Sequence, residues 1–121
     1  MVEVEANKAK NLLTIRFSGD VVPEETQRST GRLKALVAEL KPGFRLLTDL
    51  RGLATMDRAC LPDVKSNMDL CNQKGISKVV RIIPDPEKDI GFNILSLFHY
   101  RHGIPIITCE TAAEAMKALS G

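Results

Sequence analysis

The sequence predicts an α/β domain built on a mixed, mostly parallel five-stranded sheet with four helices, in the order ββαβαβαβα. Three observations support this fold class. Two short β-rich segments joined by a polar connection open the chain, a pattern typical of a hairpin. Helical patterns then alternate with short apolar runs. Because such crossovers are right-handed, we expect the hairpin at an antiparallel edge, the other strands in parallel, and the helices packed on the sheet.

Length and composition indicate one domain, residues 1–121, in the cytoplasm. Of the 121 residues, 44% are hydrophobic and 26% are charged, which is ordinary for a soluble globular domain. The formal net charge of +2, the scattered basic residues and the absence of Trp disfavour a nucleic-acid partner. No segment approaches the about 20 apolar residues that span a membrane, and the acidic start differs from a signal peptide.

The first half of the chain follows the predicted order. Residues 2–5 alternate apolar and polar side chains, and residues 12–17 are rich in β-forming residues. We expect residues 18–20 to end that second strand. Pro23 fits the first turn of a helix, and apolar residues at helical spacing continue to Leu40, after which a Pro-Gly pair stops the helix.

The middle of the chain contains the most informative junction. Residues 44–50 form a strand that is less polar than the first two, so we place it near the centre of the sheet. A short loop containing Gly52 follows. Asp57 is expected to N-cap the next helix, which ends at Gly75. The buried stripe of that helix carries four residues at helical spacing: Leu61, Val64, Met68 and Cys71.

The second half repeats the alternation of strands and helices. Residues 77–83 form a strand, and a helix spans about residues 89–102. Residues 104–108 form a short strand whose internal proline favours an edge position. The last helix opens with Thr111 and Glu114 at the spacing of a capping box.

The sequence offers no convincing set of residues for catalysis, disulfides or metal binding. Cys60, Cys71 and Cys109 are odd in number and form no CxxC pair. Cys60 stands near an expected helix start, which could activate its thiol. His99 and His102 could share a helix face, but they lack a third ligand and also suit a helix C-terminus. We therefore expect no enzyme, no metal and no cofactor.

Three short sequence motifs, taken with this order of elements, resemble those of a known protein family. Residues 17–19 read Phe-Ser-Gly, residues 46–53 read Leu-Leu-Thr-Asp-Leu-Arg-Gly-Leu, and residues 111–119 read Thr-Ala-Ala-Glu-Ala-Met-Lys-Ala-Leu. Together with the element order, they resemble the STAS family, named for sulphate transporters and anti-sigma factor antagonists. The chain looks closest to the stand-alone SpoIIAA-like branch. The resemblance spans nearly the whole chain and implies the fold described above.

The resemblance also implies a docking site at the start of the second long helix. Family members that act as anti-sigma factor antagonists carry an Asp-Ser-Ser-Gly-Leu type of motif there, and phosphorylation of one serine breaks partner binding. The matching residues here are Asp57, Arg58, Ala59, Cys60 and Leu61. The aspartate and the leucine match, but the hydroxyl groups are missing. The resemblance therefore implies a regulatory role without the usual serine phosphoswitch.

We accordingly expect a non-catalytic module that docks a regulatory protein partner at this junction. The expected contact residues are Arg51, Thr55, Asp57, Arg58 and Cys60. Asp57 would cap the helix, while the two arginines and Thr55 would supply exposed contacts. Thr55 is also the nearest hydroxyl that a kinase could modify, although a solvated loop threonine is the simpler interpretation.

The helix expected at residues 89–102 suggests an alternative function. Its apolar residues wrap most of its circumference, which exceeds the needs of one buried stripe. Such a helix is either deeply buried or covered by a second subunit, a partner or a lipophilic ligand. The face assigned to a homodimer contact or a ligand consists of Phe92, Leu95, Phe98 and Tyr100. The alternative is a carrier or sensor of a small lipophilic molecule.

Overall fold

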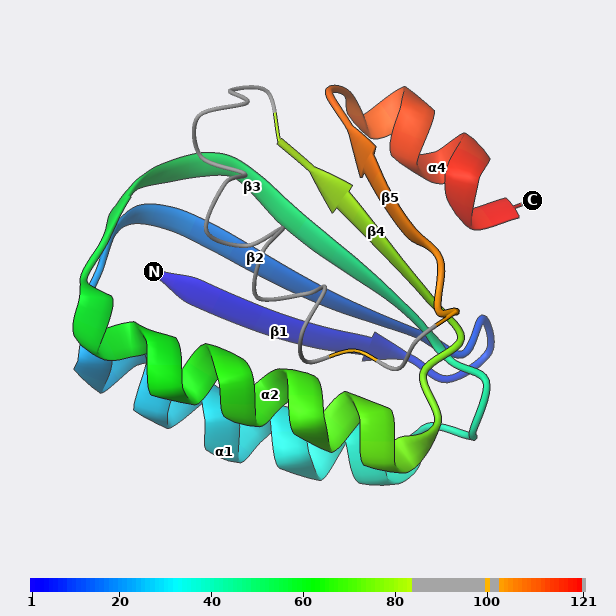
Figure 1. The fold of residues 1–121 in the computed structure, drawn as a ribbon, viewed down its shortest axis with the longest axis horizontal. Coiled ribbons are helices and arrows are strands. Elements are labelled where there is room, and N and C mark those ends of the chain that lie inside the picture. Colours follow the sequence, from blue (N-terminus) through cyan, green and yellow to red (C-terminus); the bar gives the residue numbers. More distant parts are fainter. Residues whose placement is uncertain (84–99, 101–102, 121) are drawn as a thin grey trace.

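The computed structural model describes residues 1–83, 100 and 103–120, and these form a five-stranded sheet with helices on both faces (Figure 1). The strands are β1 (Val2–Asn7), β2 (Leu12–Val21), β3 (Arg45–Met56), β4 (Lys78–Ile82) and β5 (Ile106–Cys109). The helices in this part of the chain are α1 (Pro23–Glu39), α2 (Leu61–Lys74) and α4 (Ala112–Ser120), and a short 3₁₀ turn, η1 (Arg58–Cys60), precedes α2.

The sheet has the predicted mixed topology. Its strands lie in chain order, β1-β2-β3-β4-β5. The pair β1–β2 is antiparallel, and the other neighbouring strands pair in parallel. The edge hairpin, the central place of β3 and the edge place of β5 are confirmed. Of the four expected helices, three lie in the described part of the chain, and the helix expected at residues 89–102 falls outside it except for Tyr100.

Alternating side chains along the strands divide the core between the two faces of the sheet. On one face, Leu13, Leu46 and Val79 belong to the large cluster that α1 and α2 cover. On the other face, Val80 and Ile82 pack with α4. Within the described residues, α4 covers β4 and β5. On the same face, Leu12 and Leu47 pack beside this cluster, and the ion-paired side chains of β1, β2 and β3 lie farther from α4.

Local signals in the sequence explain several element ends. Pro23 begins α1. Gly75 ends α2 in the left-handed region, with φ +97°, a backbone conformation that glycine adopts without steric cost. The hydroxyl of Thr111 accepts a hydrogen bond from the backbone N–H of Glu114 at 3.2 Å, as the capping pattern predicts.

The strands β2 and β3 are longer than the sequence patterns indicated. We expected residues 18–20 to end β2 and a loop to follow residue 50, but β2 reaches Val21 and β3 reaches Met56. The pairing of β3 with β4 stops where Asp49 lies opposite Ile82. Beyond that point β2 and β3 continue as a two-stranded parallel ribbon. Two register shifts in the ribbon interrupt its regular pairing and bend it locally.

A close approach of the two backbones explains Gly52 within this ribbon. Gly52 pairs with Ser18. A Cβ atom added to Gly52 would lie 3.1 Å from the Cβ atom of Ser18, closer than side-chain atoms normally pack. The glycine that resembled a loop signal therefore lies inside a strand, where a side chain would press against Ser18.

We expect Gly52→Val to lower the free energy of unfolding by about 1–2 kcal/mol, because the added side chain must displace Ser18 or the ribbon backbone. The control is Gly31→Ala in α1, where an added Cβ meets no atom within 4 Å. That change should leave stability unchanged or raise it by up to about 1 kcal/mol. Urea unfolding measures both. A Gly52→Val variant as stable as the wild type would argue against the close pairing.

Candidate functional site

The candidate site lies at the end of the β2–β3 ribbon, where the chain enters α1 and η1 (left in Figure 1). The carboxyl ends of parallel strands are the usual place for contacts in α/β folds. Five exposed polar residues define this region, which we call the junction surface: Asp20, Arg51, Thr55, Asp57 and Arg58.

A buried carboxylate fixes Arg51. Asp49 stands two residues earlier on β3, so both side chains point to the same face of the sheet. Nε and Nη2 of Arg51 donate to the two Asp49 oxygens at 3.0 and 2.8 Å, and the backbone N–H of Arg51 donates to Oδ1 at 3.1 Å. These hydrogen bonds outweigh burial and hold the pKa of Asp49 below its usual range. Arg51 is therefore a positioned cation with a half-exposed side chain.

The ion pair of Asp49 and Arg51 is part of a row of alternating charges. Nε of Arg16 lies 3.9 Å from Oδ2 of Asp49, and Nη1 of Arg16 lies 3.3 Å from Oε1 of Glu5. The row crosses β1, β2 and β3 on the face that α4 leaves open. The pair of Arg16 with Glu5 is exposed and the contact of Arg16 with Asp49 is long, so these two pairs contribute little stability and chiefly keep the Arg16 side chain in place.

Thr55 is fixed in a similar way by Asp20. The hydroxyl of Thr55 donates to Oδ1 of Asp20 at 2.7 Å, and the two residues pair across the ribbon. Thr55 is therefore a strand residue with a specific partner, and the expectation of a loop threonine was wrong. A phosphoryl group on Thr55 would meet the like charge of Asp20.

Asp57 caps η1 instead of the long helix. Its side chain accepts a hydrogen bond from the backbone N–H of Ala59 at 2.9 Å, and its carbonyl accepts one from the N–H of Cys60 at 2.9 Å. The helix α2 starts only at Leu61. The expected capping role is thus corrected to the turn before α2. Arg58, which belongs to that turn, is exposed and forms no ion pair within the described part of the chain.

Cys60 lies beneath the junction surface and not on it. Its side chain is 0% exposed, and Sγ lies 3.7 Å from the carbonyl oxygen of Val21. Burial raises the pKa of this thiol, which is the opposite of activation at a helix start. Cys60 is therefore out of reach as a contact residue. Cys71 and Cys109 are also free and buried, and burial raises the pKa of Cys71 to about 12.

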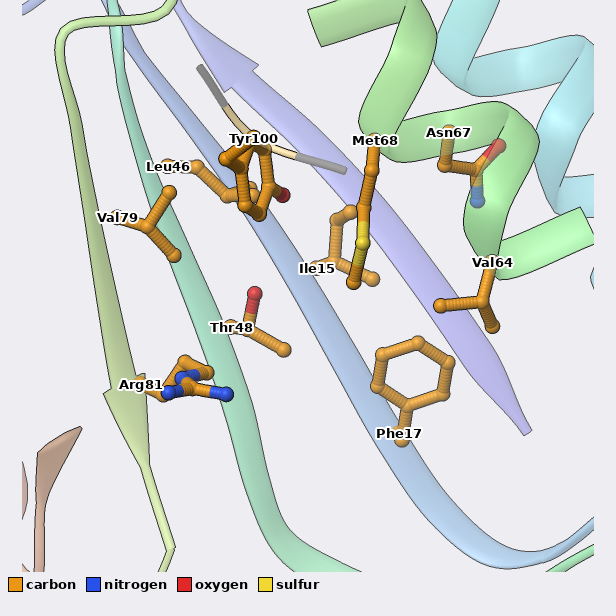
Figure 2. Close-up of a pocket in the computed structure, with 10 residues that line it drawn as sticks. All are labelled: Ile15, Phe17, Leu46, Thr48, Val64, Asn67, Met68, Val79, Arg81 and Tyr100. Atoms are coloured by element: carbon orange, nitrogen blue, oxygen red, sulfur yellow. The ribbon is translucent and has the colours of Figure 1, made fainter. Parts of the chain in front are cut away.

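A small cavity lies between the sheet and α2 (Figure 2). Its free volume is about 40 Å³, which is enough for a few water molecules. Arg81, 2% exposed, donates to the hydroxyl of Thr108 at 3.3 Å. Oδ1 of Asn67 is buried and accepts no hydrogen bond from the described residues. The cavity is lined by Ile15, Phe17, Leu46, Thr48, Val64, Asn67, Met68, Val79, Arg81 and Tyr100.

One residue of the expected dimer or ligand face lines this cavity. Tyr100 is 8% exposed, and burial raises the pKa of its hydroxyl well above the usual range. Phe92, Leu95 and Phe98 lie outside the described residues. The assignment of that face to a homodimer or to a lipophilic ligand therefore stays a prediction.

Sequence reasoning missed two acidic residues of the site, Asp20 and Asp49, as partners of Thr55 and Arg51. The spacing of two residues along one strand could have revealed the second pair, whereas the first depends on the register of β2 against β3. Among the described residues, no group of three or more His, Cys, Asp or Glu side chains could hold a metal ion. In the same part of the chain, no helix is long and apolar enough to traverse a bilayer.

Several solved structures are similar to this chain over nearly its whole length. The chain is similar to a protein of the DUF3478 family with a SpoIIAA-like fold from Shewanella loihica PV-4, at 17% identity and a TM-score of 0.72, over 98% of this chain and 92% of that chain. It is also similar to the anti-sigma factor antagonist SpoIIAA in its unphosphorylated form, at 14% identity and a TM-score of 0.70, over 100% of this chain and 99% of that chain. An anti-sigma factor antagonist from Mycobacterium paratuberculosis matches at 17% identity and a TM-score of 0.61, over 100% and 94%.

These likenesses confirm that the chain has a STAS-type, SpoIIAA-like fold. Comparisons with models of protein families and with curated protein sequences give no match. At 14–17% identity, similarity to these structures shows the fold alone, because one fold can carry many functions.

Proposed function

We propose that this protein is a non-catalytic regulatory module that docks a protein partner through the junction surface. The observation that carries the proposal is that hydrogen bonds within the ribbon and η1 hold three exposed polar side chains of this surface, Arg51, Thr55 and Asp57, in fixed positions. Asp49 holds Arg51, and Asp20 holds Thr55. Side chains that are already ordered lose little conformational freedom on binding. The regulatory role is supported by the fold, which solved anti-sigma factor antagonists share.

The proposal includes regulation without a phosphoserine at the start of α2. The family resemblance places the phosphorylated serine at Ala59 or an immediate neighbour, and Ala59 is exposed but carries no hydroxyl group. Its backbone N–H already donates to the Asp57 carboxylate. An anion at this turn would therefore meet a negative charge, where helix starts that bind phosphate offer free amide groups.

The location and the oligomeric state are further parts of the proposal. We place the module in the cytoplasm, as a single domain that works through its partner. A homodimer through Phe92, Leu95 and Phe98 is compatible with this role, because the junction surface is formed by other segments of the chain. Tyr100, the fourth residue expected on that face, is buried and is out of reach of a second subunit. Size measurement of the purified protein by light scattering tests the dimer independently of partner binding.

We expect Arg58→Glu to weaken partner binding at least about tenfold, because reversing a charge at an interface brings like charges together. The matched control is Lys65→Glu, which makes the same charge change at an exposed position on α2. Retention of the partner on immobilised protein, followed over a dilution series, measures the affinity. The thermal midpoint of both variants should stay close to that of the wild type. Equal affinity of Arg58→Glu and the control would count against the junction surface.

The cavity beside α2 favours a second candidate function, the carrier or sensor of a small lipophilic molecule. Apolar walls with a few buried polar groups are typical of ligand pockets. The present 40 Å³ would have to grow before a lipophilic ligand could enter, and the flexible side chain of Met68 is suited to such a movement. Native mass spectrometry of the purified protein tests this function. A co-purified apolar ligand would support it, and a bare chain would contradict it.

A further inference from the structure

One end of the molecule gathers positive charge from segments that are far apart in the sequence. The turns and helix ends beside the amino ends of the parallel strands meet there, at the right of Figure 1. Residues 7–12, 39–45, 74–79 and 117–120 make up this end and contain one acid, Glu39. Besides Arg45 they contain six lysines, which we call the basic end: Lys8, Lys10, Lys41, Lys74, Lys78 and Lys117.

Hydrogen bonds between the turns hold these segments together. Nδ2 of Asn11 donates to the carbonyl of Lys41 at 3.1 Å, and Oδ1 of Asn11 accepts from the N–H of Lys41 at 2.9 Å. This joins the β1–β2 turn to the connection between α1 and β3. The N–H of Gly43 in that connection donates to the carbonyl of Gly75 at 2.6 Å, which adds the end of α2. The positive charges are therefore brought together by the fold itself.

Two of the cations at this end anchor α4. Nη1 of Arg45 donates to the carbonyl of Leu119, and Nζ of Lys78 donates to the carbonyl of Ala118 at 2.9 Å. Cations at the carboxyl end of a helix are favourable, so these two residues, like Lys74 and Lys117 in the last turns of their helices, serve the fold as well.

Other lysines of the basic end have no such role. The amino groups of Lys10 and Lys41 are exposed and form no ion pair or hydrogen bond within the described part of the chain. Lys8 forms an exposed ion pair with Glu39 at 3.6 Å, which is worth little. These lysines stand on turns whose structure does not need their charge.

The opposite end of the molecule carries the opposite sign. Residues 18–25 and 51–63, which form and flank the junction surface, contain five acidic residues and two basic ones, Arg51 and Arg58. The formal net charge of +2 thus conceals a separation of charge along the molecule. Such a field orients a protein in front of a charged surface.

We propose that the basic end binds the surface of an anionic lipid bilayer. Lysine is a point charge that is attracted by many headgroups without requiring a paired geometry. Protein interfaces usually have an apolar core, but of the exposed large apolar residues in the described part only Met116 lies near this end. Phe44, the aromatic residue at this end, is 0% exposed and cannot stack on bases. Bound in this way, the protein would present the junction surface away from the bilayer.

Co-sedimentation with vesicles tests the proposal, which does not depend on the proposed docking function. Vesicles of one-third phosphatidylglycerol and two-thirds phosphatidylcholine should bind the protein at low salt, and vesicles of phosphatidylcholine alone should not. Binding should weaken steadily as salt is added, because the Debye length falls from about 30 Å at 0.01 M to about 3 Å at 1 M.

A matched pair of variants separates the basic end from net charge. Lys10→Glu/Lys41→Glu should bind the anionic vesicles at least about tenfold more weakly than the wild type. Arg28→Glu/Lys65→Glu lowers the net charge by the same amount at exposed positions on α1 and α2 and should bind within about twofold of the wild type. The proposal is overturned if both variants lose binding equally, if neutral vesicles bind as well, or if duplex DNA is bound in preference to anionic vesicles.

Discussion

Replacing Cys60 with aspartate should lower the free energy of unfolding by about 3–5 kcal/mol, the cost of leaving a buried charge without a partner. The Cys60 side chain is 0% exposed and packs under the junction between Val21 and η1. The charges of Asp57 and Asp63 act on this site and would repel a new carboxylate. Asp57 and Arg58 of the junction surface would then lose their fixed positions, because the η1 turn would be disrupted.

Urea unfolding at neutral pH measures the effect, with Cys60→Ser as the control. Serine has nearly the size of cysteine, and its hydroxyl can donate to the carbonyl of Val21, so we expect a loss of about 1 kcal/mol or less. An aspartate variant that unfolds at the same urea concentration as the serine variant would show that Cys60 is open to solvent. That outcome would disprove the packing described for the junction.

The second large effect is expected from Asp49→Asn, which should destabilise the protein by about 2–3 kcal/mol at neutral pH. The Asp49 side chain is 9% exposed and receives three hydrogen bonds from Arg51, two from the guanidinium and one from the backbone. The amide of asparagine keeps the shape of the carboxylate but loses its charge and one acceptor oxygen. Arg51 would then also become more mobile on the junction surface.

The stability that Asp49 contributes should depend on pH, and the direction of this dependence follows from its pKa. The pKa of Asp49 is lowered in the folded protein, first of all by the hydrogen bonds from Arg51. A lowered pKa contributes stability that is present above the unfolded value of about 3.9 and is lost as the pH falls through the folded pKa. Denaturant unfolding at a series of pH values should therefore show a constant gap between wild type and Asp49→Asn from pH 7 to about pH 5, which closes in acid. A gap that persists in strong acid would assign the effect to packing instead of charge.

Local signals in the sequence were sufficient for the order of the described elements and for most of their helix ends. Pro23, Gly75 and Thr111 act as the sequence patterns indicated, because each of them works through the backbone within a few residues. The antiparallel edge hairpin and the parallel remainder of the sheet followed from the short connections and the handedness of crossovers. The helix expected at residues 89–102 lies outside the described residues, so its part of the fold stays a prediction.

The site was harder to predict because it depends on pairing between distant segments. Gly52 reads as a loop residue until Ser18 lies beside it. Thr55 reads as solvated until the register places Asp20 next to it. The burial of Cys60 depends in the same way on Val21, 39 residues earlier in the chain. In each case the residue that decides the role is contributed by β2, which local patterns around residue 50 cannot reveal.

The basic end shows the same limitation on a larger scale. No run of lysines marks it in the sequence, because its members come from four separate segments. Only the meeting of the β1–β2 turn with the ends of α1, α2 and α4 brings them to one end. The net charge of the chain therefore could not predict the basic end or its binding to an anionic surface.

Partner docking at the junction surface is tested most directly by site-specific photo-crosslinking in cells of the source organism. A benzophenone amino acid replaces Ala59, an exposed residue of η1 next to Arg58, or Ala35, an exposed residue of α1 that serves as the control. Docking at the junction surface predicts one cross-linked product of discrete mass from position 59, its loss when Arg58→Glu is added, and no such product from position 35. No product from position 59, or the same product from both positions, would contradict it.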